Sequence, residues 1–136
     1  MILDTSILIA AERNALRFEA LLESLGEEPV AVAAVTASEL LHGCLRATDA
    51  GVRARRAAFV DAILELFPVL PFGLAEARRH AELWAELTRR GNLIGPHDLF
   101  IAATAVARGD RLLTLNRAEF ERVPGLRLAP AEHIPA

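Results

Sequence analysis

Four polar side chains in this chain stand where an apolar, strand-like run gives way to a helix. They are Asp4 after the first run, Glu39 after the second, Asp98 in PHDLFIAA, and Asn116 after RLLTL. Carboxylate and amide oxygens are hard ligands that select Mg²⁺ or Mn²⁺ over zinc. A cation held by a few carboxylates, with open positions, orients and acidifies water for displacement at phosphorus. If these side chains meet, the predicted chemistry is hydrolysis of a phosphodiester.

Each of these residues also has a simpler explanation as a helix cap. Thr36 and Glu39 have the spacing of a capping box. Asp98 lies in a helical first turn, and Asp4 and Asn116 are common N-cap types. Capping accounts for each residue singly, but it gives no reason for three acids to converge. Carboxylates that lie close together repel one another unless a cation holds them, so the cation site remains the sharper hypothesis.

The elements that must position these residues follow from apolar periodicity. Buried strands are predicted at residues 1–3, 30–35, 68–72, 111–115 and 126–128. Helices are predicted at 16–25, 36–46, 53–66, 75–90 and 97–108, with helical turns after the first strand and at 117–121. In the helix 75–90, one apolar stripe holds Ala77, Ala81, Trp84 and Leu87.

The alternation of these elements predicts the fold class. Strands with no wet face that alternate with helices indicate a parallel sheet covered on both sides. We therefore expect one domain over residues 1–136, an α/β fold built as a three-layer α/β/α sandwich with a central, mostly parallel sheet. In such folds ligands gather at the carboxyl ends of the strands.

Composition narrows the function further. All 15 basic residues are arginine, and the absence of lysine excludes P-loop NTPases, Schiff-base enzymes and response-regulator receivers. The net charge of −3 gives no global positive field, so nucleic acid would have to be bound by local arginine clusters. Residues 53–56 and the pair Arg89–Arg90 could border an RNA groove, although a solvated helix face is the simpler interpretation of each.

Cysteine and histidine usage point to a cytoplasmic protein without a nitrogen-based or sulfur-based metal centre. A single cysteine, Cys44, cannot form an internal disulfide, and no apolar run reaches the roughly 18 residues of a membrane span. The four histidines have no ligand spacing. His97, beside Asp98, fits a role at the edge of the pocket better than that of a base, and a plain surface histidine is simpler than either.

Three segments follow one another in the order MILDTSILIA, TASELLHGCLRA and IGPHDLFIAATAVARGDRLLTLNRAEFERVPGLRL. Together they resemble the PIN-domain ribonucleases and, among them, the VapC toxins of bacterial and archaeal toxin–antitoxin pairs. The resemblance covers nearly the whole chain and is most specific where Asp98, Thr114, Asn116 and Phe120 have the family spacing. It implies a PIN-like fold and a Mg²⁺- or Mn²⁺-dependent endoribonuclease that leaves a 5′-phosphate and a 3′-hydroxyl.

Carried over residue by residue, the resemblance implies catalytic roles for Asp4, Glu39, Asp98 and Asn116. The three acids match the family's metal ligands. Asn116 occupies the fourth, usually acidic, position and brings no charge, so one metal ion is expected rather than two. Glu119 is close enough in sequence to compensate, although its direction is open.

The family also implies supporting residues and partners. Thr5, Ser6 and Thr114 would be hydroxyls that orient carboxylates and water, with turn and cap roles equally open. A cognate VapB-like antitoxin, homodimerisation, and contact with DNA only through the antitoxin are further expectations. Residues 15–25 are amphipathic enough to serve either as core or as an interface.

Two alternatives differ in class. A catalytically weak PIN-like module that binds RNA or a partner is favoured by Asn116 and opposed by the three intact acids. A phosphatase with an aspartyl nucleophile would carry a second Asp two residues after Asp4, where this chain has Ser6. Under none of these three hypotheses does the sequence identify a particular RNA.

Overall fold

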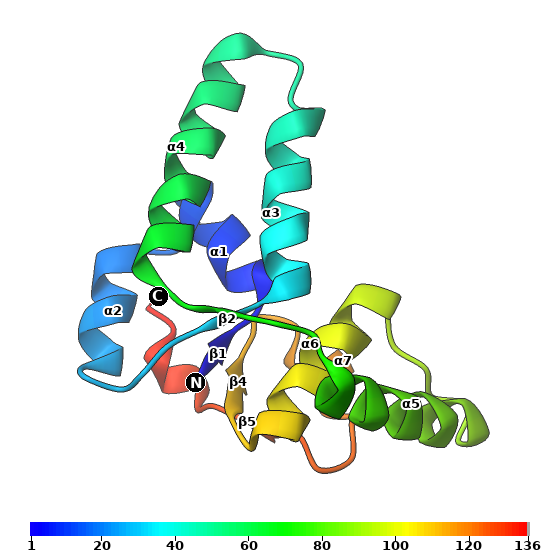
Figure 1. The fold of residues 1–136 in the computed structure, drawn as a ribbon. Coiled ribbons are helices and arrows are strands. Elements are labelled where there is room, and N and C mark those ends of the chain that lie inside the picture. Colours follow the sequence, from blue (N-terminus) through cyan, green and yellow to red (C-terminus); the bar gives the residue numbers. More distant parts are fainter. Residues whose placement is uncertain (136) are drawn as a thin grey trace.

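The structure, a computed structural model, describes residues 1–135 as five short strands separated by one or two helices (Figure 1). The strands are β1 (Ile2–Leu3), β2 (Val32–Ala33), β3 (Val69–Leu70), β4 (Arg111–Leu113) and β5 (Arg127–Leu128). The helices are α1 (Thr5–Glu12), α2 (Phe18–Leu25), α3 (Ala34–Arg46), α4 (Ala50–Leu66), α5 (Leu74–Arg89), α6 (Pro96–Arg108) and α7 (Arg117–Phe120), followed by the 3₁₀ turn η1 (Ala131–His133).

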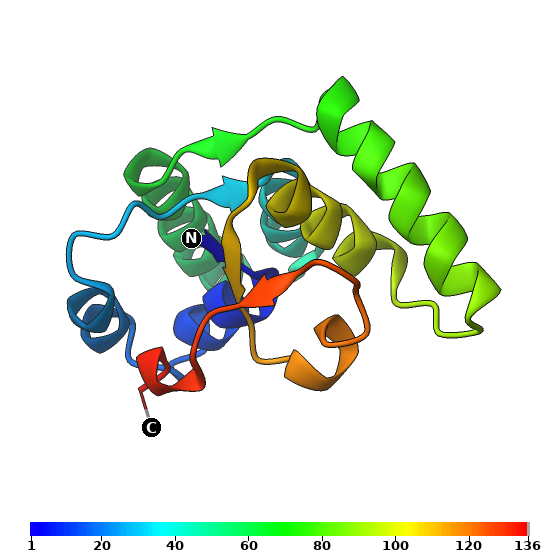
Figure 2. The ribbon, with the colours of Figure 1, turned by 90° about the horizontal axis from the view of Figure 1, so that it is seen from below.

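Every strand pair is parallel. β1 pairs with β4, β4 with β5, and β2 with β3. Figure 2 shows β2 and β3 side by side. A bridge between Ile2 and Ala31 joins the two groups, and the Leu3 N–H donates to the Ala31 carbonyl at 3.1 Å. The order across the molecule is therefore β3-β2-β1-β4-β5. Because β1 lies in the middle, the residue that follows it stands at the centre of the carboxyl edge.

Alternate strand residues enter two separate cores, because successive side chains of a strand point to opposite faces. One core contains Leu3 and Leu113 and is closed by α1, α2, α3 and α4. The other contains Ile2 and Leu112 and is closed by α5, α6 and α7. Figure 1 shows the two helix groups on either side of the strands. The predicted three-layer α/β/α sandwich with a parallel sheet is confirmed.

Glycine and proline define several helix ends. Gly26 and Gly109 follow α2 and α6 with φ of 59° and 68°, a region that glycine enters without a Cβ clash. Pro96 takes the first position of α6, where its missing N–H costs nothing. Over residues 1–135, no helix combines the length and the apolar character that a membrane crossing requires.

The second strand is shorter than predicted. β2 covers only two residues, and α3 begins at Ala34, inside the apolar run 30–35. Thr36 therefore lies within the helix, fully buried, and not at its start. An apolar run alone does not separate the end of a buried strand from the buried first turn of a helix, because both are apolar throughout.

The predicted stripe of α5 is only partly the buried face. Leu87 is fully buried, but Trp84 is 55% exposed. The buried face is formed by Glu76, Leu83 and Leu87. Leu83 and Leu87 are four residues apart and lie on one side of the helix, whereas Trp84 lies about a quarter turn away.

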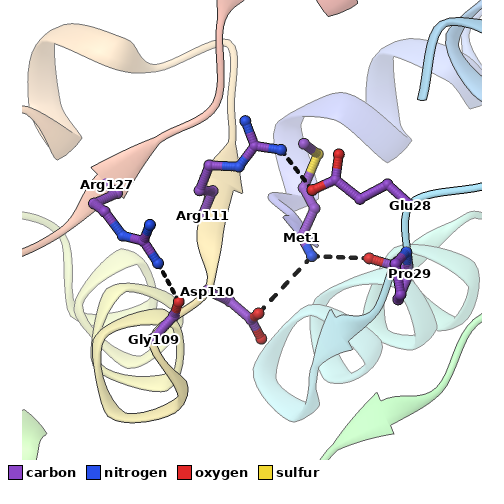
Figure 3. A network of polar contacts seen from close by, with 7 residues as sticks. All are labelled: Met1, Glu28, Pro29, Gly109, Asp110, Arg111 and Arg127. Carbon is purple, nitrogen blue, oxygen red and sulfur yellow. Dashed lines mark hydrogen bonds and ion pairs between the residues drawn. The ribbon is translucent and has the colours of Figure 1, made fainter. Parts of the chain in front are cut away.

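Charged groups are paired at the amino edge of the sheet (Figure 3). Arg111 donates to Glu28 Oε1 at 2.5 Å, and this bond lowers the pKa of Glu28 from its ordinary value. The amino group of Met1 lies 4.0 Å from Asp110 Oδ1. Two further contacts in Figure 3 end on backbone carbonyls, from Met1 to Pro29 and from Arg127 to Gly109.

Candidate active site

Asp4 stands at the end of β1 and is only 1% exposed. Its Oδ2 accepts hydrogen bonds from the Ser6 hydroxyl at 2.6 Å and from the Thr114 hydroxyl at 2.7 Å. Burial raises the pKa of Asp4, and these hydroxyls lower it only in part. Its Oδ1 is buried without a hydrogen-bond partner in the described part of the chain. An unpartnered buried carboxylate oxygen is costly, and a cation facing it would remove the cost.

The two hydroxyls are held in place by backbone donors. The Leu115 N–H donates to Ser6 Oγ at 3.1 Å, and the Asn116 N–H donates to Thr114 Oγ1 at 2.9 Å. Each hydroxyl oxygen is thus already an acceptor, which leaves its proton for Asp4. Asn116 is exposed and joins this arrangement through its backbone N–H.

Glu39 of α3 is turned toward the sheet edge by Thr5, the first residue of α1. The Thr5 hydroxyl donates to Glu39 Oε1 at 2.8 Å and lies 2.9 Å from the Thr36 hydroxyl. On the outer side, His97 Nδ1 lies 3.4 Å from Glu39 Oε2, and the His97 side chain is 63% exposed. Glu39 therefore bridges the buried edge of the sheet and the surface.

Asp98 lies in the first turn of α6, against Glu119 of α7. The N–H of Gly95, the N-cap of α6, donates to Glu119 Oε1 at 2.8 Å and so holds this carboxylate at the helix start. Burial and the nearby charge of Asp4 raise the pKa of Asp98 to about 7. A hydrogen bond to Glu119, the charge of Glu119 and then that of Glu39 add to the same shift. The four carboxylates therefore share one electrostatic environment.

Asp4 and Asn116 occupy the N-cap positions of α1 and α7, but side-chain capping bonds do not explain why the acids lie together. None of α1, α3 and α6 has a side-chain hydrogen bond at its N-cap. Glu39 accepts from Thr5 and not from the start of its own helix, so the predicted capping box is wrong. The N-cap N–H of α6 is bound by Glu119, although Asp98 is the acid in the first turn. The acids are arranged toward one another instead.

The three-ligand metal centre expected from the sequence is not preformed. Across residues 1–135, no three His, Cys, Asp or Glu side chains already form a ligand set for one ion. Like charges oppose such an arrangement in the absence of a cation. The residues nevertheless fit a cation: Asp4 has an unsatisfied oxygen within the described residues, and the pKa of Asp98 is raised by burial and by its acidic neighbours. Mg²⁺ needs only one or two carboxylates and keeps several waters.

Glu119 is the site residue whose direction the sequence left open. It lies in the short helix α7, directly before Phe120, which is fully buried. The buried ring anchors the rotation of this turn, and the carboxylate beside it then reaches Gly95 of α6. The apolar anchor next to an acid was the available signal, but its partner lies 24 residues away in sequence.

A pocket of about 480 Å³ adjoins Glu39 between α1, α3 and α4. Of the two arginine groups expected to border an RNA groove, the segment 53–56 reaches this pocket through Arg56. Arg53 instead donates to the Ala47 carbonyl at the end of α3. Arg89 and Arg90 pair with Glu86 of their own helix, as the solvated-face interpretation predicts.

Comparison with known proteins gives consistent likenesses. The family described as PIN domain matches residues 1–126. Ribonuclease VapC1 of Rickettsia felis is 37% identical over 94% of this chain and 93% of its own length. The tRNA(fMet)-specific endonuclease VapC of Shigella flexneri is 34% identical over 92% of each chain. The crystal structure of VapBC2 from Rickettsia felis bound to a DNA fragment from their promoter superposes with a TM-score of 0.86 at 28% identity, covering 94% of this chain and 96% of the other.

Proposed function

The chain belongs to the PIN-domain family, with VapC ribonucleases among its relatives, and from this premise we propose that it is a metal-dependent endoribonuclease toxin. The observation that carries the proposal is the group of four acids at the carboxyl edge, Asp4, Glu39, Asp98 and Glu119. Among residues 1–135, none of the four pairs with an arginine. Acids that face one another in this way suit a divalent cation and a phosphodiester.

Asp4 and Asp98 are the residues that would hold the Mg²⁺ or Mn²⁺ ion. The first offers an oxygen without a partner, and the second lies within the field of the other acids. Glu39 and Glu119 would contribute charge and hold water in the ion's surroundings. The bound ion would neutralise phosphate oxygens and acidify the attacking water. Asn116, which is exposed, brings no charge, and a single ion is therefore proposed.

The chain's own residues prepare the site for hydrolysis. Ser6 and Thr114 fix Asp4, and Thr5 fixes Glu39, so two carboxylates are held before substrate arrives. Water oxygen forms the new bond to phosphorus while the bond from phosphorus to the 3′ oxygen breaks. A carboxylate of the group accepts the water proton, and the leaving oxygen takes one from solvent. The products are a 5′-phosphate and a 3′-hydroxyl.

Partners follow from the relatives. The R. felis VapBC2 structure pairs a protein of this fold with DNA from the promoter of that system. We extend this to a VapB-like antitoxin that neutralises the present chain and carries the contact with DNA. A homodimer and action in the cytoplasm, where RNA substrates are abundant, belong to the same proposal.

The test is cleavage of total RNA by purified protein with Mg²⁺, with Mn²⁺ and with EDTA, followed by sequencing of the new ends. Cleavage should require the ion and leave 5′-phosphates. Asp4→Asn should abolish it while the circular dichroism spectrum stays unchanged. Glu132→Gln, on η1, is the matched control and should cleave normally. Continued EDTA-sensitive cleavage by both Asp4→Asn and Asp98→Asn would contradict the proposal.

A catalytically weak binding module is the second candidate, because no three-ligand set is preformed in the described residues. Calorimetric titration with Mn²⁺ separates the two. Binding that is lost in Asp98→Asn supports the enzyme, whereas no binding in the wild type supports the module.

A further inference from the structure

The pocket beside Glu39 is lined by residues of a different kind from the four carboxylates of the proposed active site. Its floor is apolar and is formed by Ile9, Leu40, Phe59 and Val60. A volume of about 480 Å³ lies within the range of small-ligand sites. Of the four acids, Glu39 lines this recess, and the apolar side chains beside it have no role in holding a cation.

One face of α3 leads from the carboxylates along this recess to an arginine. Glu39, His42, Gly43 and Arg46 all line the pocket and are spaced so that they lie on one side of the helix. Seven residues of α-helix span about 10 Å. Arg46 therefore lies about 10 Å along α3 from Glu39.

The arginines of the pocket are not equivalent. Arg56 is used by the fold, because it lies 3.6 Å from Glu12 Oε1 and donates to the Gly43 carbonyl at 3.2 Å. Arg13 and Arg46 are exposed, and neither has an ion pair or a side-chain hydrogen bond among residues 1–135. Both guanidinium groups line the same pocket as Glu39, in a chain whose net charge is −3. They suit a polyanion that must approach an acidic site.

We propose that this pocket receives one unstacked nucleotide of single-stranded RNA next to the cleaved bond, with Arg46 and Arg13 bound to a neighbouring phosphate. The inference rests on the proposed nuclease function and names its substrate-binding residues. A base stacks on the apolar floor, as unpaired bases do on protein surfaces. The planar guanidinium groups bind phosphate oxygens in pairs. A recess of this size between helices does not admit a duplex.

Gly43 provides a steric test of the same pocket. A Cβ built at Gly43 meets nothing within 4 Å, so a larger side chain enters open space without a backbone clash. Gly43→Met therefore fills the recess with a flexible apolar chain. The substitution also replaces a helix-interior glycine by a better helix former, so the fold should be kept.

The charge experiment compares Arg46→Gln with Arg55→Gln, an exposed arginine of α4 that does not line the pocket. Affinity for a short fluorescein-labelled single-stranded RNA is measured by anisotropy in EDTA, where cleavage is stopped. Arg46→Gln should weaken binding about tenfold and reduce the slope of log K against log salt by about 0.7. Arg55→Gln should leave both unchanged. The same RNA annealed to its complement should bind equally weakly to all three proteins.

The steric experiment compares Gly43→Met with Ala85→Met on the exposed face of α5, with circular dichroism and thermal unfolding to verify folding. Gly43→Met should weaken single-strand binding and raise KM for cleavage about tenfold, with kcat within about twofold of the wild type. Ala85→Met should match the wild type in all three quantities.

The two proposals fail in different ways. Wild-type cleavage together with unchanged RNA affinity in Arg46→Gln and Gly43→Met would overturn the pocket and leave the nuclease intact. If those variants instead lost only inhibition by the antitoxin encoded beside the toxin gene, the pocket would be a protein-binding site and the proposal would be wrong. Absence of any RNA cleavage by the wild type would overturn the nuclease itself.

Discussion

The two edges of the sheet treat charge in opposite ways. At the amino edge, Glu28 is bound by Arg111, and its pKa is lowered from the ordinary value. At the carboxyl edge, Asp98 faces other acids, and its pKa is raised to about 7. Both edges join segments far apart in sequence, and both are only partly open to water. The amino edge is stabilised by its charges, whereas the carboxyl edge is destabilised by them.

This contrast indicates which edge carries function. A fold without other demands would pair its acids with its many arginines, as it does at Glu28. Instead, carboxylates lie close together at this edge, and two hydroxyl groups donate hydrogen bonds that orient one of these carboxylates, Asp4. Groups with strongly perturbed pKa values that face a cleft are typical of active sites. The cost of the arrangement would be recovered when a cation binds.

The largest expected effect breaks the carboxyl edge. Asp98→Asn removes one of the two proposed cation ligands and should reduce RNA cleavage by at least about 100-fold. Because the substitution also removes a repelled charge, the metal-free protein should unfold at the same or a higher temperature at pH 8. Cleavage assays check the loss of activity, and calorimetry of the same preparation checks the unfolding temperature. Cleavage within about twofold of the wild type would show that this acid is not part of the reaction.

The next effect tests the hydroxyls behind Asp4. Thr114→Val keeps the shape of a fully buried side chain but removes the donor to Asp4 and the acceptor of the Asn116 N–H. Unsatisfied buried groups should lower the free energy of unfolding by about 1–3 kcal/mol. Urea denaturation measures this, with Thr88→Val on exposed α5 as a control expected within about 0.5 kcal/mol of the wild type. Equal stability of the two variants would show that the hydroxyl is dispensable.

The pH dependence sharpens the same contrast. The folded chain holds the Asp98 proton up to a pKa of about 7, whereas the unfolded chain releases it near the ordinary 3.8. Between these values the folded state binds more protons, so this group's contribution to stability falls as pH rises through the window. In EDTA, the free energy of unfolding of the wild type should therefore fall relative to that of Asp98→Asn as the pH rises from 4 to 7. Added Mg²⁺ should offset this loss of stability most near pH 7. A difference between the two proteins that does not change with pH would contradict the prediction.

The smallest effect belongs to the amino edge. Glu28→Gln removes one partner of an ion pair whose side chains are about one third exposed. Pairs of this kind contribute about 0.2–1 kcal/mol, and stability above the lowered pKa of Glu28 should fall by no more than that. RNA cleavage should not change. A loss of cleavage with unchanged stability would mean that the two edges are coupled, and the comparison would then fail.

Much of the fold was predictable because its signals are local. Strand and helix periodicity, the glycines after α2 and α6, and Pro96 at the start of α6 each act within a few residues. Element order then implied a parallel sheet and placed Asp4, Asp98 and Asn116 near one edge. Local signals failed at β2 and along α5, where an apolar residue could belong to a strand or a helix, or to either of two helix faces. The exposure of Trp84 is the clearest case.

The sequence alone identified the site residues and the strand ends that carry them. It also excluded chemistry that depends on lysine. Tertiary packing decided what those residues face. Thr5 reaches Glu39 across 34 residues, Thr114 reaches Asp4 across 110, and Gly95 holds Glu119 across 24. Packing also pairs Arg56 with Glu12, whereas Arg46 has no ion pair within residues 1–135. Periodicity is a property of neighbours in the chain, whereas pKa shifts and unpaired charges are properties of neighbours in space.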